Sequence, residues 1–91
     1  MDEDELRKEQ HRGQRAKALL DNALLKEAFE KVDAECVRLW REAKDHEARE
    51  GMWLRLQSLA HVRSAIEGIV KDGDIADRKL KQLIQGKKPL F

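Results

Sequence analysis

The sequence predicts an all-α protein built as a long antiparallel helical hairpin with a short helix at each end. Charged residues make up 41% of the 91 positions, there is no Tyr, and Pro occurs once. Ala, Leu, Glu, Lys and Arg dominate, and these residues favour long solvent-exposed helices. Apolar residues also recur every three or four positions over two long stretches, which is the period of one helix face.

The chain begins with the acidic stretch "MDEDE" and continues into a weakly helical pattern. Residues 1–5 have little to bury, so we expect a disordered acidic start. Residues 6–20 predict a short first helix whose apolar end consists of Ala16, Leu19 and Leu20. Asp21 and Asn22 follow, and either side chain can cap the next helix by accepting from its first free N–H groups.

Two long helices are predicted next, over residues 23–43 and 46–71. The first has an apolar seam with alternating spacings of four and three, formed by Leu25, Phe29, Val32, Cys36, Leu39 and Ala43. The second repeats this seam with Met52, Leu56, Leu59, Ile66 and Val70. Such seams face a partner helix. Asp45 caps the second helix, and the short connection predicts an antiparallel hairpin over residues 23–71.

The hairpin sets which residues lie opposite one another. Positions whose numbers sum to about 92 should be neighbours when two helices fold back across a short turn. Trp40 should therefore meet Trp53 near the connection, and Phe29 should lie near Arg63.

Arg63 occupies a seam position between Leu59 and Ile66, where an apolar residue would continue the repeat. Its aliphatic stem can pack while its charged head pairs with Glu27 or Glu30. Alternatively, a polar residue in a seam fixes the register or the oligomeric state. Both interpretations require a carboxylate partner.

The C-terminal part of the chain carries turn signals. Gly73 lies at a C-cap-like position, and Asp74 can cap a short fourth helix over residues 75–84. We therefore expect one helical domain over residues 6–85 and a basic tail over 86–91. The tail ends in Leu90 and Phe91, which either pack back on the hairpin or contact another chain.

The predicted core is too thin to use all of the apolar positions within one chain, so the sequence predicts a homo-oligomer. The residues expected at contacts with another subunit or a partner are Leu39, Trp40, Trp53, Leu56, Arg63, Ile66, Leu90 and Phe91.

No catalytic or metal-binding constellation is present in the sequence. The three His residues lie on different segments, and the single Cys36 falls in the predicted seam, where a buried thiol is unreactive. We therefore expect no enzyme activity, no metal and no cofactor. A lone cysteine, no secretion signal and no apolar run near the roughly 20 residues of a membrane span predict a soluble intracellular protein.

A basic stripe lies on the first predicted helix. Lys8, Arg12 and Arg15 are spaced to share one helix face, with Glu5 and Glu9 close by. The stripe is interpreted as a solvated face, as a contact to nucleic acid phosphates, or as a site for an acidic protein partner. The net charge of +1 gives no general attraction to nucleic acid.

Two stretches, "RGQRAKALLDNALLKEAF" over residues 12–29 and "REGMWLRLQSLAHVRSAIEGIVKDG" over 49–73, resemble short helical proteins of tailed bacteriophages and prophages. The architecture is also similar to the oligomerisation core of phage small terminase subunits, which usually carry an additional N-terminal helix-turn-helix domain. This chain has only a short basic helix in that place. The resemblance implies a non-enzymatic assembly or adaptor protein in the host cytoplasm, with itself, packaging proteins or DNA as partners. A small inhibitor of a host or defence protein is the remaining alternative.

Overall fold

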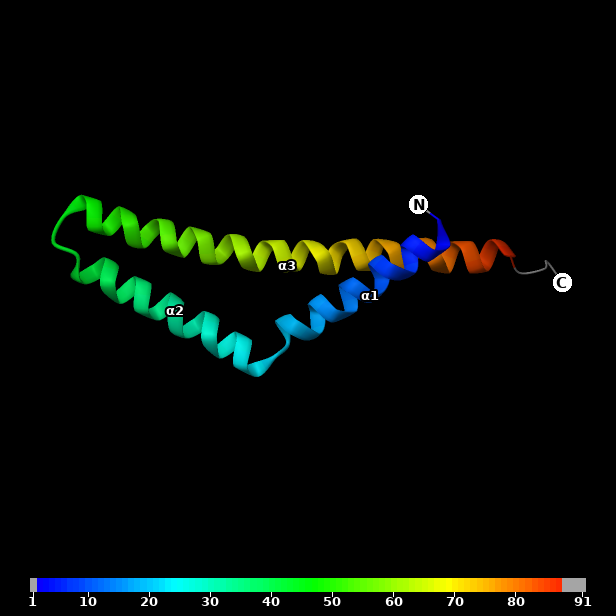
Figure 1. Cartoon of the computed structure of the whole chain (residues 1–91), viewed down its shortest axis with the longest axis horizontal. Helices are drawn as coiled ribbons and strands as arrows, with labels where there is room; N and C mark the ends of the chain where they lie inside the picture. Colours follow the sequence, from blue (N-terminus) through cyan, green and yellow to red (C-terminus); the bar gives the residue numbers. More distant parts are fainter. Residues whose placement is uncertain (1, 88–91) are drawn as a thin grey trace. The chain divides into compact units, whose positions relative to one another are not determined.

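The computed structural model describes residues 2–87, and all of its regular structure is helical (Figure 1). The prediction of an all-α chain is therefore confirmed over these residues. The helices are α1 (Glu3–Leu20), α2 (Ala23–Glu42) and α3 (His46–Lys87). Contacts divide the chain into two compact units, whereas the sequence predicted one domain over residues 6–85. Unit 1 contains α1 up to Leu19 together with residues 66–87 of α3, and unit 2 covers Leu20–Ala65.

Two of the three predicted helix caps are confirmed. The Asn22 side chain accepts a hydrogen bond of 3.0 Å from the backbone N–H of Leu25 at the start of α2. Asp45 accepts one of 2.7 Å from the backbone N–H of Ala48 at the start of α3. Each cap satisfies an N–H group that has no partner inside the helix, which fixes where both helices begin.

The acidic start is more ordered than the sequence predicted. Helix α1 begins at Glu3, so residues 3–5 are helical, and Asp2 accepts a hydrogen bond of 2.8 Å from the backbone N–H of Glu5. Carboxylates in the first turn interact favourably with the positive end of the helix dipole. The same carboxylates that keep this segment from being buried therefore stabilise the N-terminal end of α1.

The prediction of a break at Gly73 and a separate fourth helix over residues 75–84 was wrong. Helix α3 continues through Gly73 and Asp74 to Lys87, as one uninterrupted ribbon in Figure 1. A glycine C-cap requires a positive φ angle, and none of the described glycines has one. The predicted tail over residues 86–91 is thus helical at 86 and 87, while Leu90 and Phe91 lie outside the described residues.

Unit 1 is built around a close approach of two glycines. A Cβ atom placed on Gly73 would lie 2.5 Å from the Cα of Gly13, and one placed on Gly13 would lie 2.6 Å from the Cα of Gly73. The backbones of α1 and α3 therefore touch at this point, where no larger residue fits. Beside it lies the buried apolar cluster of Leu6, Ala76 and Leu80.

A polar contact lies at the edge of the same packing. Asp77 accepts a hydrogen bond of 2.7 Å from the Gln10 amide, and Lys81 lies 3.0 Å from its other carboxylate oxygen. The hydrogen bond from Lys81, and then the one from Gln10, hold the pKa of Asp77 below its ordinary value. Ionised Asp77 therefore stabilises the contact between α1 and α3.

This contact predicts an acid dependence of stability. The contribution of Asp77 is fully present above its unfolded pKa of about 3.9 and is lost as the pH falls through the lower folded pKa. Asp77→Asn should therefore be less stable than the natural protein at pH 7, with a difference that shrinks below about pH 4. Urea unfolding midpoints between pH 7 and pH 2, with Asp74→Asn as the control, measure this. A difference that stays constant across this range would contradict the role of Asp77.

Unit 2 contains α2 and residues 46–65 of α3. Phe29 is buried in α2, and the guanidinium carbon of Arg63 lies 4.9 Å from the centre of its ring. The predicted neighbourhood of these two residues is confirmed. The expected ion pair with Glu27 or Glu30 is not found among the described residues, because the Arg63 head lies over the aromatic face instead.

Candidate interaction surface

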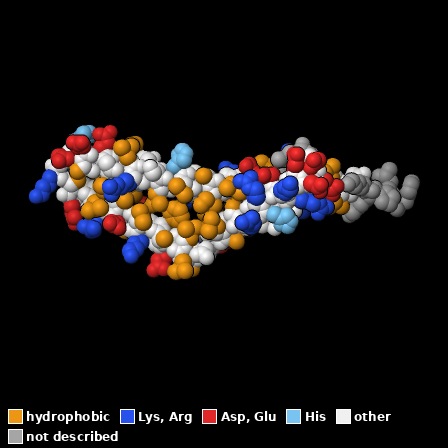
Figure 2. Space-filling model, viewed as in Figure 1, with side chains coloured by type: hydrophobic (Ala, Val, Ile, Leu, Met, Phe, Trp, Pro, Cys, Tyr) orange, Lys and Arg blue, Asp and Glu red, His pale blue; other side chains and the backbone are white. Residues whose placement is uncertain are grey.

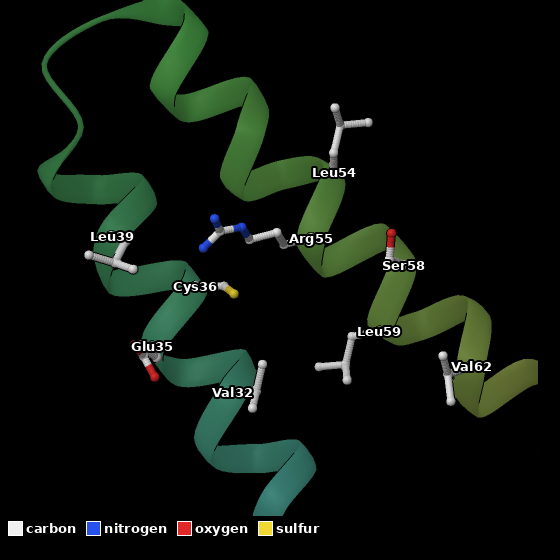
Figure 3. Close-up of a pocket in the computed structure, with 9 residues that line it drawn as sticks. All are labelled: Val32, Glu35, Cys36, Leu39, Leu54, Arg55, Ser58, Leu59 and Val62. Carbon is white, nitrogen blue, oxygen red and sulfur yellow. The ribbon is translucent and has the colours of Figure 1, made fainter.

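A long apolar groove lies between α2 and α3 within unit 2, with a volume of about 510 Å³ (Figure 3). Its lining residues are Val32, Glu35, Cys36, Leu39, Leu54, Arg55, Ser58, Leu59 and Val62. Within each helix, the lining residues recur every three or four positions, so each helix contributes one continuous face. We call this surface the unit 2 groove.

The floor of the groove is buried and its walls are exposed. Cys36 is 6% exposed, whereas Leu54 and Val62 on α3 are each 53% exposed. In Figure 3, Cys36 and Leu59 point from opposite helices into the space between them. Figure 2 shows apolar side chains at the surface of this unit, with charged side chains around them. Exposed apolar surface beside a shallow floor is typical of a contact with another protein.

Two opposite charges border the groove. Glu35 lines it from α2 and Arg55 from α3, where the Arg55 side chain extends toward α2 (Figure 3). Both residues are exposed, and neither takes part in an ion pair within the described part of the chain. The groove therefore offers an apolar floor with one acidic and one basic group available at its edges.

A second apolar patch lies where α2 connects to α3. Trp40 and Trp53 line one pocket, as the predicted register required of two residues near the connection. They remain 43% and 50% exposed. Arg49 donates a hydrogen bond of 3.3 Å to the carbonyl oxygen of Ala43, which ties the start of α3 to the connection. The patch is therefore held at a defined end of unit 2.

The structure separates the residues that the sequence placed in one contact surface. Leu39 lines the unit 2 groove, but Leu56 is partly buried and lies outside it. Ile66 belongs to unit 1, where it lines a groove with residues of α1. The predicted hairpin seam thus changes partner near residue 66, from α2 to α1. Sequence reasoning missed Leu54 and did not use the spacing that places it with Ser58 and Val62 on one face.

The basic stripe lies on the surface of α1. Lys8, Arg12 and Arg15 are all exposed, and Arg12 is paired with Glu9 at 2.8 Å. Arg12 and Arg15 line the groove of unit 1 that contains Ile66. One of the three charges is therefore already balanced within the helix.

Among residues 2–87, His, Cys, Asp and Glu side chains do not gather in groups of three or more that could hold a metal ion. None of the described helices has a stretch both long and apolar enough to cross a bilayer. No protein-family model matches the chain, and comparisons with curated proteins and with solved structures find no match.

Proposed function

We propose that this chain is a non-enzymatic helical protein that assembles with itself through the unit 2 groove. The observation that carries the proposal is the half-exposed pair Leu54 and Val62 beside the buried Cys36. Only six apolar side chains are buried among the described residues, and no large side chain is completely buried. A small helical chain with so little core gains stability when another chain covers its apolar faces.

The occupant of the groove is a second copy of unit 2. In this proposal α2 and residues 46–65 of α3 form an antiparallel hairpin, and two hairpins stacked on their grooves make a four-helix bundle. Helices of such bundles pack 8–10 Å apart with apolar faces turned inward. A second copy supplies an apolar face of the same length and width as the first, which suits an open groove lined along its whole length.

Glutamate substitutions in the groove test this assembly. Leu54→Glu and Val62→Glu each remove an apolar contact and place a carboxylate in the interface, so self-association should weaken by roughly tenfold to a hundredfold. Leu24→Glu is the control, because Leu24 is a 74% exposed residue of α2 outside the groove. Sedimentation equilibrium at micromolar concentration measures the mass, and circular dichroism verifies that helicity is retained.

Two results would overturn the proposal. One is a natural protein that stays monomeric at micromolar concentration. The other is a Leu54→Glu or Val62→Glu variant that associates as well as Leu24→Glu, which would place the interface elsewhere.

We also propose that the assembly serves phage particle formation, as an adaptor or an accessory of DNA packaging. This part of the proposal rests on the resemblance of residues 12–29 and 49–73 to short helical phage proteins. Purification from infected cells should recover further copies of the chain together with phage packaging proteins. Recovery of a host protein in equal amounts, without any phage component, would favour the inhibitor alternative and contradict the assembly role.

A further inference from the structure

We infer that the copies in this assembly are related by two-fold symmetry, with Glu35 of each copy paired to Arg55 of the other. The inference rests on the proposed self-association through the unit 2 groove and adds its symmetry, its register and a reciprocal pair of charges. The two residues border the same groove from opposite helices, and neither has an ion-pair partner among residues 2–87. A self-complementary surface of this kind is what a two-fold interface requires.

The register of unit 2 places the two charges at nearly the same height. Arg63 lies over Phe29, and Trp40 shares a pocket with Trp53, so Glu35 lies level with residues 57 and 58. Arg55 is two or three residues away, which is about 3 to 5 Å along the helix axis. An arginine side chain spans that offset.

This equal height selects one symmetry axis. A two-fold axis that runs along the groove, parallel to the helices, preserves height and exchanges the two sides. It places α2 of each copy over α3 of the other, so that Glu35 meets Arg55 twice. An axis across the groove would instead place α2 over α2 and would leave both charges without opposite partners.

The helix directions agree with the same axis. Within unit 2 the chain reverses direction between α2 and α3 (Figure 1). With the axis along the groove, each helix has antiparallel neighbours both within its own copy and across the interface. Antiparallel neighbours place the opposite ends of the helix dipoles beside each other, and up-and-down bundles have this arrangement.

Charge reversal tests the pairing. Glu35→Arg alone and Arg55→Glu alone each create two like-charge contacts per pair of chains, so self-association should weaken roughly tenfold. The combined variant Glu35→Arg/Arg55→Glu should recover the natural affinity. An equal mixture of the two single variants should also associate, because each interface then holds two opposite-charge pairs. Sedimentation equilibrium at low and high salt measures all four samples, and the defect should shrink at high salt.

The matched controls are Glu30→Arg and Arg41→Glu, which make the same charge changes on α2 outside the groove. If the natural chain is monomeric, both the proposed function and this inference fail. If the natural chain associates and the single groove variants behave like the controls, only the charge pairing fails. Weak single variants that neither the mixture nor the combined variant restores would also overturn the pairing.

Discussion

Gly73→Ala is expected to destabilise the protein by about 1–2 kcal/mol, even though alanine is the better helix former by about 1 kcal/mol. The added methyl group would lie 2.5 Å from the Cα of Gly13, and backbone atoms cannot move aside as a side chain can. The helices must separate by about an ångström, and a gap of that size forfeits a quarter to a half of each affected contact. The neighbouring cluster of Leu6 and Leu80 would lose packing as a consequence.

Gly68→Ala is the matched control on the same helix. A Cβ atom on Gly68 would meet nothing within 4 Å, so this substitution should stabilise the protein by about 0.5–1 kcal/mol through helix propensity alone. Urea unfolding followed by circular dichroism at one protein concentration measures both variants. Opposite signs for the two substitutions identify the close approach, whereas a stabilising Gly73→Ala would show that the backbones do not touch there.

The two glycines also explain why the sequence predicted too many helices. Glycine near an Asp is a strong turn signal, and the C-cap interpretation of Gly73 used it in that sense. The same glycine continues the spacing of three and four that leads from Ile66 to Ala76 and Leu80. That periodicity was the stronger signal. A residue without a side chain at a seam position indicates a close helix crossing, but its partner Gly13 can only be identified once the helices are placed.

Local chemistry was the most predictable part of the fold. Asp45, and either Asp21 or Asn22, were predicted as caps because their short side chains can accept from the next helix, and the structure places Asn22 and Asp45 in this role. The prediction that Trp40 and Trp53 lie at the same end of the two helices also followed from the short connection, since a tight turn leaves little freedom of register, and both residues line one pocket. Contacts between residues close in sequence could be predicted because the geometry of a single cap or turn determines them.

The unit 2 groove was harder to predict because the seam changes partner along one helix. Periodicity shows which residues of α3 share a face, but it does not show which helix covers that face. Leu39 lines the groove, whereas Ile66 was expected to face α2 and instead lies with residues of α1. The exposed face of unit 2 depends on a second apolar stripe of α3, which contains Leu54 and Val62. From the sequence alone, this stripe cannot be distinguished from a widening of the buried apolar face of α3.

Phe29→Ala is expected to cost about 3–4 kcal/mol, the loss typical of a buried aromatic residue cut back to a methyl group. Phe29 is 8% exposed and is the buried aromatic residue of unit 2 in the described chain. Its ring also carries the guanidinium of Arg63 at 4.9 Å, an interaction worth about 0.5–1 kcal/mol at an exposed site. Urea unfolding at one protein concentration measures the cost, and Leu24→Ala, at a 74% exposed position, should cost less than about 0.5 kcal/mol.

A double-mutant cycle separates the two contributions of Phe29. Phe29→Leu retains most of the apolar volume and removes the aromatic face, so combining it with Arg63→Gln isolates the coupling between ring and charge. A coupling near 0.5–1 kcal/mol means that Arg63 occupies its seam position because Phe29 provides a partner there. A coupling of zero would mean that only the stem of Arg63 packs. In that case, the position of Glu35 and Arg55 along the helix axes would be inferred from Trp40 and Trp53 alone. The cycle therefore also tests the register of α2 against α3, on which the two-fold pairing is built.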